Sequence, residues 1–307
     1  MLTQKIEKGI QEYQNRLESW MLDHHLLSSH DNYQKFVIVC NIRTGSTLLG
    51  SLLSSHPQTL CFFELFHRHL ESIPFSVLGY RAKSSDRKIV SLRNNDPARF
   101  LQQEIYKPQH PRIKAVGFKL LYPQGRADNP WWNSPEFDRW WKDVGYEPSW
   151  SSAKSDVWTY LKDNTDIAIV HLKRKNLLRS KVSGKTAQKT GNWGIGATGG
   201  IGNPSEAVKF KLDFNECLQD FEAHRRMEDE TDEFFANHRV LSVTYEDLVG
   251  NPTQTTNEIQ RFLSLDIQSL ATKTKKQASK PLSDIIQNYQ ELQEAFSNTS
   301  WVQLFED

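Results

Sequence analysis

Residues 36–49 constrain the fold more than any other part of this 307-residue chain. The segment begins with a run of β-branched and aromatic residues that is typical of a buried strand. A short polar turn containing Gly45 follows, and an apolar pattern with helical spacing resumes at Leu48. In a strand–turn–helix unit, the backbone N–H groups of the turn and the positive end of the helix dipole point at the same place. The sequence therefore predicts a phosphate or sulfate site at this turn.

The side chains of the turn agree with this interpretation. Arg43 adds a fixed positive charge, and the hydroxyls of Thr44, Ser46 and Thr47 add donors. Ser and Thr would also suit an ordinary helix cap, so the residues alone leave that alternative open. The Walker A pattern GxxxxGK[ST] is not met, because its first glycine and its lysine are both missing. This absence argues against a nucleoside triphosphate as the ligand.

Composition excludes several classes of protein. Hydrophobic residues make up 37% of the chain and charged residues 24%, as in a soluble globular protein, and the net charge of +1 gives no reason to expect a nucleic-acid partner. No apolar run approaches the roughly 20 residues of a membrane span, and the charged N-terminus is unlike a signal peptide. The three cysteines stand in apolar or helical contexts and make no disulfide framework. We therefore expect a cytoplasmic protein without a membrane partner.

Apolar patterns along the chain alternate between strand and helix character. This alternation predicts a single α/β domain over residues 1–307, with a P-loop-like three-layer fold in which helices flank a central parallel sheet. No strand is expected in residues 65–110. The strands are expected at 36–41, 60–64, 113–121, 167–172 and 240–245, and helices at 46–55, from near 175, and at 214–236, 254–264 and 282–295.

Three further segments have a distinct character. Residues 1–30 carry an amphipathic helical pattern, which we expect to dock on the core or on another subunit, so a homodimer is possible. Residues 122–165 form a Trp-rich insertion. Residues 191–202 are rich in glycine and are expected to form a mobile loop.

A second basic cluster follows the strand expected at 167–172. Arg174 and Lys175 stand at the end of that strand, and Ser183 lies about two helical turns further on. Ligand crevices of parallel sheets lie at the carboxyl ends of the strands, so these residues are expected beside the first turn. A solvated basic helix face is the alternative, and it is the usual role of such a run.

Two anion sites at strand ends, without a Walker lysine, resemble the sulfotransferases that use 3′-phosphoadenosine 5′-phosphosulfate (PAPS). The resemblance is to the bacterial group that includes trehalose 2-sulfotransferase and the nodulation-factor sulfotransferases. It covers residues 36–64 and 166–295 and is weak across 65–165. The matching motifs are Arg43-Thr44-Gly45-Ser46-Thr47-Leu48-Leu49, Arg174-Lys175 with Ser183, Val243 to Leu248 with Asn251-Pro252, and Lys276-Gln277 with Pro281-Leu282, Asp284 and Asn288-Tyr289.

The resemblance implies PAPS as donor and its product PAP (3′,5′-diphosphoadenosine) as the second ligand, with no metal. It places the 5′-phosphosulfate on residues 43–48, the 3′-phosphate on Arg174 or Lys175 with Ser183, and a further cofactor contact on Lys276 and Gln277. The spacing from Arg174 to Ser183 is one residue longer than in the animal cytosolic enzymes. Which of the two basic residues holds the 3′-phosphate therefore stays open.

Sulfuryl transfer needs a base near the sulfur and positive charge at the leaving oxygen. Arg43 suits the second role. Glu64 ends the strand expected at 60–64, which we expect next to the first strand, and it stands where the related bacterial enzymes carry a glutamate proposed as base. A structural pair with Arg68 is the alternative role for Glu64, and His67 or His69 could serve as base instead.

The acceptor is less constrained. His67 and Trp193 are the candidate acceptor-binding residues. The resemblance implies a carbohydrate or another small molecule that offers a hydroxyl or an amine. A P-loop-type small-molecule kinase and a non-catalytic nucleotide-binding protein are the alternative functions.

Overall fold

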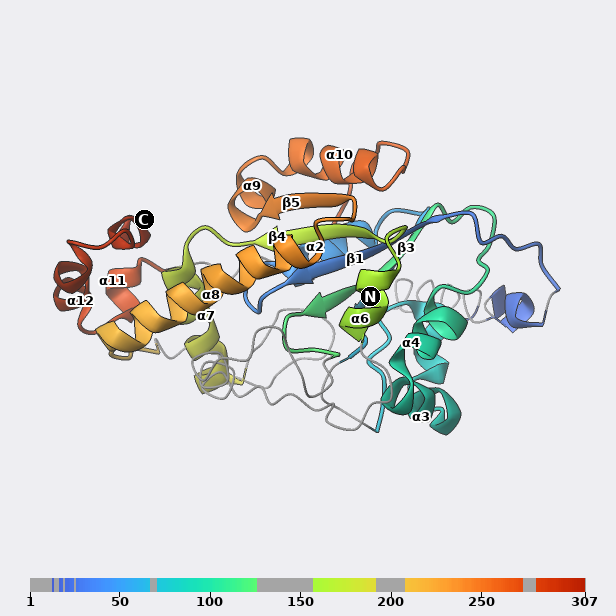
Figure 1. Ribbon diagram of the computed structural model, residues 1–307, viewed down its shortest axis with the longest axis horizontal. Helices are drawn as coiled ribbons and strands as arrows, with labels where there is room; N and C mark the ends of the chain where they lie inside the picture. The colour runs from blue at the N-terminus through green and yellow to red at the C-terminus, as the bar shows by residue number, and fades with distance from the viewer. Residues whose placement is uncertain are drawn as a thin grey trace, which may run out of the picture.

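Five strands form one parallel sheet in the computed structural model, in the order β2-β3-β1-β4-β5 (Figure 1). The structure describes residues 13, 17–18, 20–24, 26–66, 71–125, 157–191, 208–272 and 280–306. The central strands consist almost entirely of buried residues, as expected for strands covered on both faces. The strands are β1 (Gln34–Cys40), β2 (Thr59–Glu64), β3 (Ala115–Leu121), β4 (Ala168–Lys173) and β5 (Val240–Thr244).

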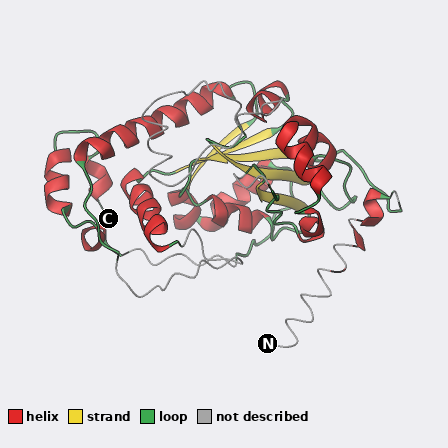
Figure 2. Cartoon of the chain, turned by 90° about the horizontal axis from the view of Figure 1, so that it is seen from below, coloured by secondary structure: helices red, strands yellow, loops and turns green. Residues whose placement is uncertain are grey.

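Helices cover both faces of the sheet and extend beyond one end of it (Figures 1 and 2). The α-helices are α2 (Ser46–Leu53), α3 (Arg87–Asn95), α4 (Pro97–Phe100), α6 (Val157–Asp163), α7 (Leu177–Thr190), α8 (Phe214–Phe234), α9 (Tyr245–Gly250), α10 (Pro252–Phe262), α11 (Leu282–Ile285) and α12 (Tyr289–Phe296). Short turns of other helix types are η1 (Leu78–Lys83), η2 (Leu101–Ile105) and η3 (Val302–Phe305).

The strand register assigns these helices to two faces. Successive residues of a strand point to opposite faces. Lys119, which is paired with Ile38, lies over the ring of Phe63, on the face that α2 covers. His171, which is paired with Val39, contacts α8 on the other face. The predicted three-layer α/β fold is confirmed.

Two hydrophobic clusters stabilise this arrangement. The larger one surrounds the sheet, and the smaller one is built from α7, α8, α11, α12 and η3. Helix α8 contributes to both, with Phe221 in the smaller cluster and Met227 in the larger. The long helix therefore ties the C-terminal helices to the sheet.

Some expectations need correction. The helix expected over 282–295 is two helices, because Ile286 is extended and the segment pairs there with Phe210. Strand β2 was expected beside β1, but β3 lies between them. Within the described part of residues 65–110 no strand joins the sheet, as predicted.

Several predictions stay untested or are met only in part. At the N-terminus the described residues between 13 and 23 are helical, and Tyr13, Leu17 and Trp20 are exposed rather than docked on the core of this chain. Most of the Trp-rich insertion and of the glycine-rich loop lies outside the described residues, and the single-domain prediction stays a prediction. A search of the described residues finds no helix that is both long and apolar enough to cross a membrane.

Candidate active site

The turn after β1 has an unusual backbone that its own side chains hold in place. Arg43 has φ 58° and Gly45 has φ 85°, both in the left-handed region, which is uncommon for a residue other than glycine. The Asn41 carboxamide accepts a hydrogen bond from the backbone N–H of Ile42 at 2.8 Å. The Thr44 hydroxyl donates to the backbone oxygen of Asn41, also at 2.8 Å. The hydroxyl of Thr44 thus stabilises the turn itself.

Helix α2 begins at this turn with an open N-terminus. Gly45 is its N-cap residue and offers no side-chain cap, and within the described residues no other side chain is seen to cap the helix. A Cβ atom at Gly45 would lie 2.4 Å from Cδ2 of Tyr245, so only glycine fits there. Ser46 is buried at the first position of the helix, whereas Thr47 is exposed. The N–H groups of the first turn are therefore available to an anion.

The two predicted anion sites meet at Arg43. β4 pairs directly with β1, which brings the end of β4 beside the turn. Arg43 donates from Nε to Oγ of Ser183 at 2.9 Å, and Arg174 donates from Nη1 to the backbone oxygen of Arg43 at 2.6 Å. Arg43, Arg174 and Ser183 thus form one cluster rather than two separate sites.

The electrostatics of this cluster favour an anion. Burial, together with the charge of Arg174, lowers the pKa of Arg43 to about 10. Burial likewise lowers the pKa of Arg174. The Nε atom of Arg174 is buried and has no hydrogen-bond partner within the described residues. A bound anion would satisfy this donor and offset the repulsion between the two guanidinium groups.

Arg174 and Lys175 occupy different environments. The guanidinium of Arg174 stacks on the ring of Tyr245, 4.6 Å from its centroid. The Lys175 ammonium lies 3.1 Å from Asp247, and both of these side chains are about half exposed. Only Arg174 points its charge at the turn after β1.

Glu64 is held by two buried donors. Oε1 of its carboxylate lies 2.6 Å from the Lys119 ammonium, and Oε2 accepts from Nε2 of Gln124 at 2.8 Å. Lys119 and Gln124 are 3% and 1% exposed. The Gln124 amide is itself oriented, because its Oε1 accepts from the backbone N–H of Leu121. The sequence analysis missed both donors, although a lysine within the otherwise apolar strand β3 was a usable signal.

The position of Glu64 differs from the expectation. β3 separates β2 from β1, so Glu64 pairs in register with Lys119, which in turn pairs with Ile38. The apolar strand β3 lies between β2 and β1, where both of its faces can be buried. Since all the strands are parallel, Glu64 still ends its strand at the same edge of the sheet as the turn after β1. Glu64 is therefore linked to β1 through Lys119 of β3, and not by direct pairing of β2 with β1 as expected.

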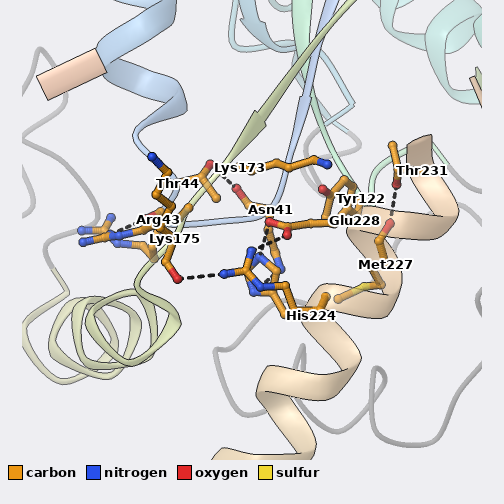
Figure 3. A network of polar contacts seen from close by, with 12 residues as sticks. Asn41, Arg43, Thr44, Tyr122, Lys173, Lys175, His224, Met227, Glu228 and Thr231 are labelled. Carbon is orange, nitrogen blue, oxygen red and sulfur yellow. Dashed lines mark hydrogen bonds and ion pairs between the residues drawn. The ribbon is translucent and has the colours of Figure 1, made fainter. Parts of the chain in front are cut away.

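A second group of polar residues that the sequence analysis missed lies on α8 (Figure 3). Its signal was a polar residue at every fourth position, a spacing that places these side chains on one face of a helix. His224 lies 3.1 Å from the Asn41 carboxamide and 3.4 Å from Glu228. The four residues are Asp220, His224, Glu228 and Asp232.

Most of the remaining predicted site residues lie outside the part of the chain that the structure describes. His67, Trp193, Lys276 and Gln277 lie outside the described residues, as do Arg68 and His69. Leu48 is half-buried on α2. No group of three or more potential metal ligands occurs within the parts of the chain that are described.

Comparisons with known proteins agree with the resemblance found in the motifs. The model of the Stf0 sulphotransferase family matches residues 148–292. Nodulation protein H of Rhizobium tropici is 25% identical over 287 residues, which cover 92% of this chain and 96% of that protein. Nodulation protein H of Rhizobium meliloti (strain 1021) is 24% identical and covers 89% and 95%. A crystal structure of a sulfotransferase from Alicyclobacillus acidocaldarius aligns over 88% of this chain and 94% of that one, with 12% identity and a TM-score of 0.43. The predicted similarity to sulfotransferases is confirmed.

Proposed function

We propose that this protein transfers a sulfuryl group from PAPS to a hydroxyl or amine of a carbohydrate or another small molecule, with Glu64 as general base. The similarity to sulfotransferases supports sulfuryl transfer in general. The identities of the donor, PAPS, and of the base, Glu64, are the parts that this proposal adds. The observation that carries the donor is the half-buried cluster of Arg43, Arg174 and Ser183 beside the N-terminus of α2.

The residues of this cluster fit a ligand with two anionic groups. The N–H groups of the turn and of α2 would hold the 5′-phosphosulfate, together with Arg43. Arg174 and Ser183 would hold the 3′-phosphate, and the unsatisfied Nε of Arg174 supplies a donor for it. The side chain of Lys175 is turned toward Asp247, which favours Arg174 for this role.

PAPS supplies an activated sulfuryl group whose bond to the 5′-phosphate is ready to break. An acceptor oxygen or nitrogen forms a bond to sulfur while the bond from sulfur to the bridging oxygen breaks. The bond electrons remain on that oxygen and leave with the 5′-phosphate of PAP. The acceptor proton passes to the carboxylate of Glu64.

Lys119 and Gln124 prepare Glu64 for this task. Two donors fix the position of both carboxylate oxygens. Arg43 and the helix N-terminus stabilise the negative charge that develops on the leaving oxygen. The proposed steps draw on no metal ion.

Calorimetric titration with PAP and with ADP tests the donor. We expect clear binding of PAP and much weaker binding of ADP, because only PAP carries a 3′-phosphate for Arg174. Equal or tighter binding of ADP would contradict the proposal and would favour the kinase alternative. Preference for PAP without transfer to any of a panel of sugars, alcohols and amines would favour a non-catalytic nucleotide-binding protein.

A further inference from the structure

We propose that a chain of polar contacts on α8 sets the spacing between the two anion-binding loops and thereby selects nucleotides that carry both a 5′- and a 3′-phosphate. This inference rests on the proposed function. The chain runs from Asn41 through His224, Glu228 and Arg225 to the backbone of Lys175 (Figure 3). Arg225 is its positioning residue, because it reaches the second loop through the backbone oxygen of Lys175 and not through a side chain expected to touch the ligand.

At its first end, this series of contacts holds the loop after β1 through Asn41. The Asn41 side chain uses its oxygen to accept from the N–H of Ile42. Its nitrogen lies 3.1 Å from Nδ1 of His224, which acts as the acceptor. Asn41 is fully buried and His224 is 4% exposed. The residue that shapes the turn is therefore fixed to α8 rather than to a neighbouring strand.

The middle of the chain is a buried charge cluster. Nε2 of His224 lies 3.4 Å from Oε1 of Glu228, and Nη1 of Arg225 lies 2.6 Å from Oε2. Glu228 is 2% exposed. Because a buried carboxylate needs its cationic partner, removal of Arg225 is costly, and Glu228 holds Arg225 and His224 next to each other.

At its second end, the series of contacts holds the loop after β4 through Arg225. Nη2 of Arg225 donates to the backbone oxygen of Lys175 at 2.8 Å. The planar guanidinium thus joins a carboxylate on α8 to the loop that carries Arg174. One side chain spans the gap between the helix and the second loop.

The consequence concerns the specificity of binding. A ligand that touches both loops gains full affinity only when the loops already stand at the separation of its two charged groups. A ligand that touches one loop gains nothing from that separation. Changes along such a network alter the coupling between sites about 2- to 30-fold. Loss of the α8 contacts should therefore weaken binding of PAP and spare binding of adenosine 5′-monophosphate (AMP).

Calorimetry with PAP and AMP on the full-length protein tests this inference. Arg225→Lys keeps the positive charge beside Glu228 but cannot bond two separate acceptors with one rigid plane. We expect PAP affinity to fall about tenfold in this variant, AMP affinity to change less than about twofold, and the ratio of the two to fall accordingly. Arg225→Ala should lower the ratio further, provided that it folds.

The neighbouring arginine supplies the matched control. Arg226 lies on the same helix and is exposed, so Arg226→Lys and Arg226→Ala make the same changes at the adjacent position, outside the contacts of Glu228 and Lys175 described above. An unchanged PAP to AMP ratio in Arg225→Lys, with the wild-type preference for PAP intact, overturns this inference alone. Absence of any preference in the wild-type protein overturns the proposed function, and this inference with it.

Discussion

Arg43 donates a hydrogen bond from Nε to the hydroxyl of Ser183 over 2.9 Å, although 140 positions separate the two residues in the chain. This contact joins the turn after β1 to helix α7. It means that the groups expected to hold the two ends of one ligand already touch each other. The predictions below follow from this assembled cluster and from the contacts behind it.

Gly45→Ala should damage donor binding more than a comparable change elsewhere. Gly45 has φ 85°, and a new Cβ would collide with Tyr245, the ring on which Arg174 stacks. Gly191→Ala is the matched control, because Gly191 has φ 67° and no atom of the described residues lies within 4 Å of the new Cβ. Both changes carry left-handed strain of about 1–2 kcal/mol. Only Gly45→Ala should also displace Tyr245 and weaken PAP binding, measured by calorimetry beside the melting temperature.

Arg174→Ala should reduce PAP affinity by about 10- to 100-fold, the worth of a charge-assisted hydrogen bond in a buried site. Lys175→Ala should cost far less, because the Lys175 ammonium faces Asp247 at the surface. Titration of both variants with PAP checks the difference. A larger loss in Lys175→Ala than in Arg174→Ala would reverse the assignment of the 3′-phosphate.

Glu64→Gln should abolish sulfuryl transfer and leave PAP binding within about twofold, since the carboxylate serves as base and not as donor ligand. Transfer is measured as formation of PAP in the presence of an acceptor found by screening. Turnover that persists in Glu64→Gln would remove Glu64 from the mechanism. His67 would then be the next candidate for the base.

Glu64→Gln should also lower the free energy of unfolding, by about 1–3 kcal/mol. The new amide must turn its NH₂ group toward either the Lys119 ammonium or Nε2 of Gln124, and either choice sets two donors against each other. The double variant Lys119→Met/Glu64→Gln should recover part of this loss, because it removes the buried charge as well. Denaturant unfolding of the two single variants and the double variant measures the coupling. Strictly additive effects would contradict the proposed pairing.

Stability should fall in acid between about pH 4.5 and pH 2 through Glu228. Burial alone would raise the pKa of this carboxyl, but its contacts with His224 and with the charged Arg225 outweigh burial and lower the pKa to about 2. A carboxyl whose pKa is lowered by folding stabilises the folded state at pH values above its ordinary pKa of 4.5. This contribution, at most about 3 kcal/mol, is lost as the pH falls toward the lowered pKa of about 2. Melting curves against pH check this. Glu228→Gln should be less stable at neutral pH and should show a flatter acid limb.

The sequence predicted the strands and the turn between β1 and α2 well, because both are local patterns. A run of buried β-branched residues followed by a polar turn is readable within residues 36–49. The helix expected at 282–295 failed because Ile286 pairs with Phe210, a contact between distant segments. The predicted order of β2 and β3 was wrong for the same reason, since no local pattern determines which of these two strands pairs with β1.

Residues of the candidate site were predictable only where they stand in a recognisable sequence motif. Arg43, Arg174 and Ser183 stand in recognisable motifs, and the structure brings them together. Lys119 and Gln124 lie on a strand and on the turn after it, where a single polar residue has many structural explanations. Their relation to Glu64 depends on strand order, which the pattern of one chain does not encode.

Helix α8 also bears on how the protein assembles during synthesis. Asn41 leaves the ribosome early, but its partner His224 follows 183 residues later. The turn after β1 cannot acquire its buried carboxamide contact until more than two thirds of the chain has been translated. A nascent chain truncated before α8 should therefore carry β1 without the contact that supports the proposed nucleotide site. A ligand present during translation can therefore stabilise only the nearly finished protein, and the early strands must stay soluble without its help.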